Sequence, residues 1–244
     1  MATEQQRLPA SWNRFWSRPI GWFLGHVLYR TSVAGKSNIP AAGPVIFAAN
    51  HISFLDGPVM YGAAPRPMHI MVKKEMFKGF LGRVLTASGQ IPVDRSGDRA
   101  ALHLGKELLD GGRCVGILPE GTRGTGAAES ISSGVAWLAV NSGATVIPVA
   151  ILGTRHPGEH RDHIPRLRRK LYVSFGEPLT VQRRKGEPGR VSMDRAAAAI
   201  RDALAAHVQE AVRKTGQALP REAAPEPDQH HRHIEVAGTP ADHH

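Results

Sequence analysis

Apolar runs of strand length alternate with helix-like segments over most of this chain. The strand-like runs are residues 45–49, 69–72, 91–93, 114–118, 145–152 and 171–175. The helix-like segments between them are roughly residues 54–61, 74–85, 99–109 and 134–141. This order predicts an α/β fold with a mixed or mainly parallel sheet flanked by helices. In such sheets, functional residues collect at the carboxyl ends of the strands.

The chain has 244 residues, enough for one sizeable domain. We predict that this domain spans residues 29–214 and ends in an alanine-rich packing helix over residues 194–214. Residues 215–244 are rich in Pro, Ala and His, which is typical of a disordered tail. No apolar stretch approaches the roughly 20 residues that a membrane-spanning helix needs.

The first 28 residues are rich in aromatic side chains. Trp12, Trp16, Trp22 and Phe23 lie here, with several arginines among them. Tryptophan and arginine together suit the headgroup layer of a membrane, where a ring buries its body and keeps its N–H hydrated. We therefore predict an N-terminal interfacial segment over residues 1–28. The alternative is a pair of short helices that close the core of the domain.

Charge and cysteine usage narrow the class of protein further. The formal net charge is +10, which favours nucleic acid, anionic membranes or phosphorylated substrates as partners. Neither zinc-finger spacing nor an RNA-binding aromatic signature is present, so nucleic acid is not expected as a partner. The one cysteine, Cys114, lies in a predicted buried strand and suits a reducing compartment such as the cytoplasm.

A histidine and an aspartate follow the first apolar run at a spacing of five. His51 and Asp56 lie in the stretch Asn-His-Ile-Ser-Phe-Leu-Asp. A histidine accepts a proton near neutral pH, and a carboxylate fixes its tautomer and stabilises the imidazolium. Five positions on a regular helix subtend roughly 500°, so the two side chains would not share a helix face. The pair works only if His51 lies in the loop and Asp56 reaches back from the next turn.

Three further blocks follow in order. They are Gly-Gln-Ile-Pro-Val-Asp-Arg at 89–95, Leu-Pro-Glu-Gly-Thr-Arg at 118–123 and Val-Ile-Pro-Val at 146–149. With the His51 block, they resemble the glycerolipid acyltransferase family, and the closest likeness is to the bacterial 1-acyl-sn-glycerol-3-phosphate (lysophosphatidic acid) acyltransferases. The likeness covers about residues 29–178. Gly124, Ser132 and Ser133 depart from the family pattern, which often has a serine at the first position and a lysine near the other two.

The resemblance implies an O-acyltransferase of phospholipid biosynthesis. His51 and Asp56 would be catalytic, and the acyl group would pass from acyl-CoA or acyl carrier protein to the free hydroxyl of 1-acyl-glycerol-3-phosphate, giving phosphatidic acid. The substrate-binding residues implied are Arg95, Glu120, Gly121, Thr122, Arg123 and Lys73. Arginine suits phosphate because its guanidinium binds in a bidentate way. No metal and no cofactor beyond the acyl donor is implied, and the expected location is peripheral, on the cytoplasmic face of the cell membrane.

Two alternatives stay open at this point. The acceptor could be another lysolipid or a membrane alcohol or amine, which Ser132 and Ser133 make credible. The chain could also be a non-catalytic lipid-binding protein on the same fold, although such a protein has no need of His51 and Asp56. The chain lacks the Gly-x-Ser-x-Gly elbow of serine hydrolases, so no covalent acyl-enzyme is expected.

Overall fold

The computed structural model describes residues 27–94, 98–120, 125–128, 133–160 and 163–220. Within them, seven strands form one sheet in the order β1-β7-β6-β2-β5-β3-β4. The strands are β1 (Arg30–Ala34), β2 (Val45–Ala49), β3 (Met68–Lys73), β4 (Ile91–Val93), β5 (Cys114–Ile117), β6 (Thr145–Leu152) and β7 (Lys170–Phe175). Neighbouring described strands run parallel except β6 and β7, which confirms the mainly parallel sheet.

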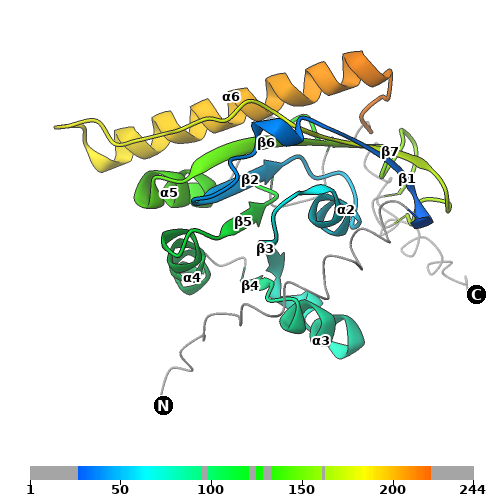
Figure 1. Ribbon diagram of the computed structural model, residues 1–244, viewed down its shortest axis with the longest axis horizontal. Coiled ribbons are helices and arrows are strands. Elements are labelled where there is room, and N and C mark those ends of the chain that lie inside the picture. The colour runs from blue at the N-terminus through cyan, green and yellow to red at the C-terminus, as the bar shows by residue number, and fades with distance from the viewer. Residues whose placement is uncertain (1–26, 95–97, 121–124, 129–132, 161–162, 221–244) are drawn as a thin grey trace, which may run out of the picture.

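Helices cover both faces of the sheet. They are α2 (Asp56–Ala63), α3 (Gly79–Ala87), α4 (Arg99–Asp110), α5 (Ser133–Ser142) and α6 (Gly189–Thr215), with short 3-10 turns η2 (Lys36–Asn38) and η3 (Lys74–Met76). Figure 1 shows α4, α5 and α6 on one side of the sheet and α2 on the other. This layering is what parallel strands with helical crossovers produce.

The central strand β2 is buried along its whole length. Phe47 points into a core cluster with α2, whereas Ile46 and Ala48 point into a second cluster with α4, α5 and α6. A strand buried on both faces has no polar side to alternate with, so it reads in the sequence as a continuous apolar run. Burial on both faces holds β2 in a fixed position, and the loop of the candidate site follows its last residue.

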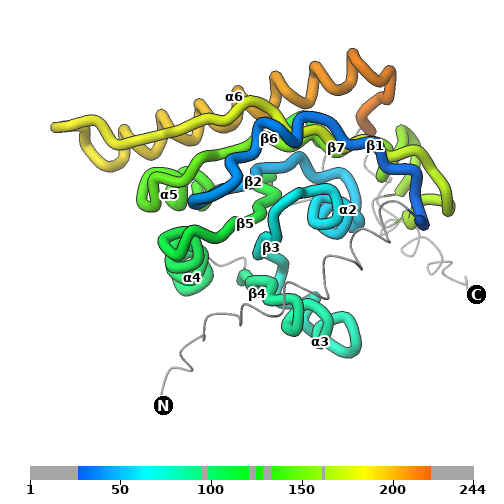
Figure 2. Tube along the Cα trace, viewed as in Figure 1, coloured from blue at the N-terminus to red at the C-terminus, as the bar shows by residue number. Residues whose placement is uncertain are grey.

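One edge of the sheet collects the carboxyl ends of β2, β3, β4, β5 and β6, because these strands run in the same direction. The connection from β6 to β7 lies at this edge too, next to the start of β1 (Figure 2). A backbone hydrogen bond of 2.6 Å from Arg168 N–H to the Leu28 carbonyl joins the two segments there. We call this edge the carboxyl edge.

Several elements differ from the sequence prediction. β1 was not predicted, because its residues alternate between exposed and half-buried at the rim of the sheet. The helix predicted over 74–85 is divided into η3 and α3, since Gly79 takes a left-handed φ of 59° that few other residues tolerate. At the other end, α6 begins at Gly189 rather than near residue 194.

The packed structure also extends past the predicted start of the tail. Thr215 is the last residue of α6, and Leu219 packs against the core cluster that α6 forms with β6. The predicted tail from residue 221 onward lies outside the described residues, as do residues 1–26 of the predicted interfacial segment.

Candidate active site

The loop that carries His51 begins at Asn50, whose side chain adds two hydrogen bonds to β6 beyond its last backbone bond. Asn50 is fully buried, and its Nδ2 donates to the Ile151 carbonyl at 3.0 Å while its Oδ1 accepts from Ile151 N–H at 2.7 Å. The side-chain amide thus makes the pair of bonds to β6 that another strand residue would make. The N–H of Asn50 makes the last backbone bond to β6, at 3.3 Å to the Val149 carbonyl, and the main chain can leave the sheet after it.

His51 and Asp56 are in contact. His51 Nδ1 lies 3.0 Å from Asp56 Oδ2, and the imidazole is 18% exposed whereas the carboxylate is fully buried. His51 lies in the loop, and Asp56 begins α2 and reaches back, as the five-residue spacing requires. A carboxylate accepts hydrogen bonds, so Nδ1 carries the proton and Nε2 is the nitrogen turned away from Asp56.

Two backbone N–H groups and one hydroxyl hold the Asp56 carboxylate in place. The N–H groups of Ile52 and Ser53 both donate to Oδ2 at 2.7 Å, and the hydroxyl of Thr154 donates to Oδ1 at 2.6 Å. Asp56 and Thr154 are both completely buried. A buried carboxylate needs such donors, and with them it can orient His51 as a fixed group.

Glu120 is the third ionisable side chain at this point of the sheet. Its Oε1 accepts the backbone N–H of His51 at 3.2 Å. Burial raises the pKa of the Glu120 carboxyl above the usual glutamate value, and the negative charge of Asp56 adds to the rise. Hydrogen bonds from the N–H groups of His51 and Ala128 act in the opposite direction and lower the pKa. Through its hydrogen bond to the His51 N–H, Glu120 joins the segment after β5 to the His51 loop.

The segment that follows the block at 118–123 packs against the same loop. Gly126 has a left-handed φ of 74°, and a Cβ placed on it would lie 2.1 Å from Cγ2 of Ile52 and 3.0 Å from Nδ2 of Asn50. Only glycine fits this approach, because both the backbone conformation and the space exclude a side chain. The close contact packs residues 125–128 against the base of the His51 loop.

Most N–H groups of the loop are engaged within the protein. The N–H groups of residues 50–53, 55 and 56 each donate to a protein acceptor. Phe54 N–H is the one in this loop for which the described residues supply no acceptor. Among the N–H groups of this loop, Phe54 N–H is therefore the one left to act as a donor to an oxyanion.

The other predicted substrate-binding residues fall into two groups. Lys73 is the last residue of β3, partly buried, at the carboxyl edge. Arg95, Gly121, Thr122 and Arg123 lie outside the described residues, as does Ser132. The structure thus brings His51, Asp56 and Glu120 together and places Lys73 at the same edge of the sheet.

Sequence reasoning missed Thr154, and it did not assign a role to Asn50. Thr154 follows β6 and is 98 positions from its partner Asp56, so no local spacing links them. The sequence does indicate a role for Asn50. A polar residue directly after a wholly apolar strand is buried with it, so its side-chain amide needs hydrogen-bond partners at the strand end.

The described residues contain neither a membrane-spanning helix nor a metal-binding cluster. None of the described helices combines the length and the apolar composition of a bilayer-spanning segment. No cluster of His, Cys, Asp or Glu side chains in the same part of the chain is arranged to hold a metal ion.

The chain belongs to the Acyltransferase family. The family model matches residues 30–152, which is half of the 244-residue chain. The matched range contains the His51 loop, Glu120 and the strands from β1 to β6.

Known proteins of similar sequence carry a more specific name. The 1-acyl-sn-glycerol-3-phosphate acyltransferase of Borreliella burgdorferi is 30% identical over 140 residues, which is 55% of this chain and 55% of that protein. The protein of the same name from Helicobacter pylori is 36% identical over 111 residues, 43% of each chain. The chain thus matches about half the length of these relatives.

One solved structure resembles this chain over most of its length. The 1-acyl-sn-glycerophosphate (LPA) acyltransferase PlsC from Thermotoga maritima aligns with a TM-score of 0.62, covering 80% of this chain and 78% of that one. At 24% sequence identity the likeness shows a shared fold.

Proposed function

We propose that this chain is a 1-acylglycerol-3-phosphate O-acyltransferase of phospholipid biosynthesis. It moves a fatty acyl group from acyl-CoA or acyl carrier protein to the free hydroxyl of 1-acyl-glycerol-3-phosphate, giving phosphatidic acid. The contact between His51 and Asp56, with Nε2 turned away from the carboxylate, is the observation that carries the proposal. A non-catalytic lipid-binding protein has no use for such a pair.

In the proposed reaction His51 acts first as a base and then as an acid. Nε2 removes the proton from the acceptor hydroxyl as its oxygen attacks the thioester carbonyl. Asp56 stabilises the imidazolium, which then gives the proton to the departing sulfur. We assign Phe54 N–H as the loop donor that stabilises the oxyanion. Both substrates are bound together, so no acyl-enzyme forms.

The acceptor phosphate needs fixed positive charge near this pair. We assign that role to Arg95 and Arg123, with Lys73 at the carboxyl edge as a further cation. Gly121 and Thr122 would let the backbone and a hydroxyl approach the acceptor. Glu120 is negative when ionised, so it contributes through the His51 backbone and not through the phosphate.

We place the enzyme peripherally on the cytoplasmic face of the cell membrane. The aromatic and arginine residues of segment 1–28 suit the headgroup layer. Insertion of Trp12, Trp16, Trp22 and Phe23 would bring the site to a lipid that does not leave the bilayer.

An acceptor panel tests the proposal. Purified protein is given labelled acyl-CoA or acyl carrier protein with lysophosphatidate, lysophosphatidylcholine or monoacylglycerol. We expect lysophosphatidate to be preferred, and Arg123→Ala to lower its kcat/KM by about one to two decades. Arg190→Ala, an exposed arginine at the other edge of the sheet, is the control and should change nothing. Preference for a phosphate-free acceptor would replace lysophosphatidate by the alternative acceptor.

A further inference from the structure

Most of the large apolar side chains that stay exposed lie in segments along the carboxyl edge. Those in the described part of the chain are Val27, Phe54, Phe80, Leu81, Ile164, Leu167 and Val191. All but Val191 lie in segments that leave or reach this edge. Val191 lies at the opposite edge, because β7 runs antiparallel to β6 and α6 follows β7.

Three separate connections present five of these six side chains, and Val27 precedes β1. Phe54 lies in the His51 loop after β2. Phe80 and Leu81 are in the first turn of α3, and β4 begins opposite Met71, so this whole connection stays near the end of β3. Ile164 and Leu167 are in the connection after β6. The apolar groups are therefore distributed along the carboxyl edge, from the β3–β4 connection on one side of β2 to the β6–β7 connection on the other.

These side chains are too exposed to belong to the core. Phe80 is 81% exposed, Ile164 70% and Leu167 69%. Single exposed apolar residues are ordinary, but a group of them at one edge indicates a surface that meets another apolar phase.

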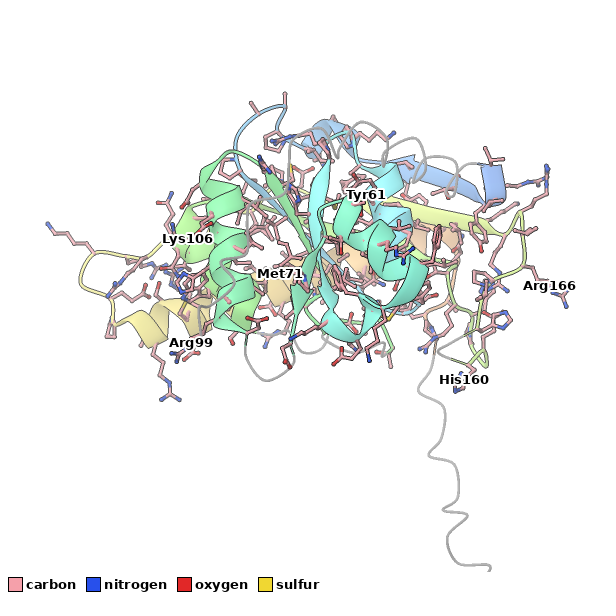
Figure 3. The ribbon with its side chains drawn as sticks, turned by 90° about the horizontal axis from the view of Figure 1, so that it is seen from below. Tyr61, Met71, Arg99, Lys106, His160 and Arg166 are labelled. Atoms are coloured by element: carbon pink, nitrogen blue, oxygen red, sulfur yellow. The ribbon has the colours of Figure 1, made fainter. Side chains whose placement is uncertain are left out.

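Basic residues accompany the apolar ones. Segment 163–170 carries Arg166, Arg168, Arg169 and Lys170 and has no acidic residue. Figure 3 shows Arg166 projecting outward from one end of the molecule. On the α3 side, Lys74, Lys78 and Arg83 are exposed, against Glu75. Positive charge beside exposed apolar groups is the composition that binds anionic lipid surfaces.

The base of the β6–β7 connection is held firmly. Both guanidinium nitrogens Nη1 and Nη2 of Arg169 bind the carboxylate of Glu159, at 2.7 and 2.5 Å. The bond from Arg168 N–H to the Leu28 carbonyl adds a second tie, beside Val27. Ile164, Leu167 and Arg166 are thus presented on a supported loop, next to the point where the N-terminal segment joins the domain.

We propose that the carboxyl edge is a second membrane-docking surface, in addition to the N-terminal segment. Phe80, Leu81, Ile164 and Leu167 enter the headgroup layer of an anionic bilayer, and Arg166 and Arg168 bind its phosphates. The docking turns the His51 loop toward the bilayer, from which the acceptor enters. This inference rests on the proposed function, which gives the enzyme a membrane-resident substrate. The apolar groups are spread over three connections, which fits a broad lipid surface better than one bound peptide.

Vesicle binding by the full-length protein tests the surface. The variants are Ile164→Ser with Leu167→Ser, Phe80→Ser with Leu81→Ser, and Arg166→Glu with Arg168→Glu. Matched controls at the opposite edge are Val191→Ser, and Lys185→Glu with Arg190→Glu, all exposed residues. Co-sedimentation uses vesicles of phosphatidylcholine with phosphatidylglycerol, and of phosphatidylcholine alone. Circular dichroism checks each fold.

We expect each carboxyl-edge variant to bind anionic vesicles about tenfold more weakly, and the controls to bind as wild type. On vesicles of phosphatidylcholine alone, Arg166→Glu with Arg168→Glu should bind as the wild type does. Wild-type binding by the carboxyl-edge variants, or equal losses in the controls, would overturn the proposal. So would normal vesicle binding with activity lost only toward acyl carrier protein, since the edge would then be a protein-docking site.

Acyl transfer to lysophosphatidate in detergent micelles keeps the two proposals apart. Carboxyl-edge variants should retain wild-type rates there, because micelles deliver the acceptor without a bilayer. If the wild type transfers no acyl group but the variants still lose vesicle binding, the docking surface stands and the proposed function fails.

Discussion

The hydroxyl of Thr154 donates to Oδ1 of Asp56 at 2.6 Å, and both residues are completely buried. Thr154 lies just beyond β6, whereas Asp56 begins α2 after β2. The bond therefore ties the neighbouring ends of two parallel strands together through the carboxylate that orients His51. The orientation of the imidazole thus depends on the sheet as well as on its own loop.

Replacing Thr154 by valine, which has nearly the same side-chain shape but no hydroxyl, should slow acyl transfer. The substitution leaves Oδ1 of Asp56 without its hydroxyl donor, and hydrogen bonds to charged groups are worth about 1.5–3 kcal/mol. Since Ile52 and Ser53 still hold Oδ2, we expect kcat to fall about tenfold with KM little changed. Thr154→Ser keeps the hydroxyl and should stay near wild type. An unchanged kcat in folded Thr154→Val would show that Thr154 does not help Asp56 to orient His51.

Replacing Glu120 by glutamine should preserve activity, whereas alanine should not. Glutamine still offers a carbonyl oxygen to the His51 N–H, and alanine leaves that N–H without its acceptor, at a cost of about 1–3 kcal/mol. Steady-state kinetics of Glu120→Gln and Glu120→Ala separate the hydrogen bond that Glu120 accepts from the negative charge that it carries. If glutamine were as harmful as alanine, the carboxylate charge itself would act on the acceptor.

The difference in stability between Glu120→Gln and the wild type should also change with pH in a defined direction. The folded protein raises the pKa of Glu120, so it binds the proton more tightly than the unfolded chain does. Wild-type stability therefore falls as pH rises from the ordinary glutamate value of 4.5 through the raised pKa. The variant escapes this fall, and its advantage in urea unfolding should grow over that window and then level off. An advantage that shrinks with rising pH would contradict the burial of Glu120.

Replacing Arg169 by glutamine should loosen the β6–β7 connection. The hydrogen bond from Arg169 lowers the pKa of Glu159 to about 2. Because the folded pKa lies below the ordinary 4.5, the stabilisation is complete above 4.5 and is lost as pH falls toward 2. We expect Arg169→Gln to cost about 1 kcal/mol near neutral pH, with the difference from wild type shrinking below 4.5.

Arg201→Gln is the control for this measurement, because Arg201 pairs with the exposed Asp202 and should contribute little. Chemical unfolding at a series of pH values gives both differences. A loss in Arg169→Gln that persists unchanged at low pH would mean that packing, and not the ion pair, holds the connection.

The fold could largely be predicted because its central strands are buried on both faces. β2 and β6 read as unbroken apolar runs, and their order with the helices determines a mainly parallel sheet. β1 could not be predicted, since an edge strand with half-exposed residues has no such run. The break before α3 depends on the backbone conformation of Gly79, which the helical pattern does not encode.

The site could be predicted only where its residues are close in sequence. His51 lies in a loop and Asp56 begins the helix that follows it. Their five-residue spacing is therefore enough to predict that Asp56 reaches back to His51. Thr154 and Glu120 reach this pair only through the pairing of strands, and each is more than 60 positions from its partner. The links from Thr154 to Asp56 and from Glu120 to His51 therefore arise from tertiary structure.

The most direct test of the account is the rate of acyl transfer to lysophosphatidate by His51→Ala. The exposed His103→Ala on α4 is the control, and circular dichroism with thermal unfolding establishes that both variants fold. A positioned general base contributes about 10²- to 10⁴-fold, so kcat of His51→Ala should fall at least about a hundredfold while His103→Ala stays near wild type. Turnover near the wild-type rate in folded His51→Ala would contradict the mechanism.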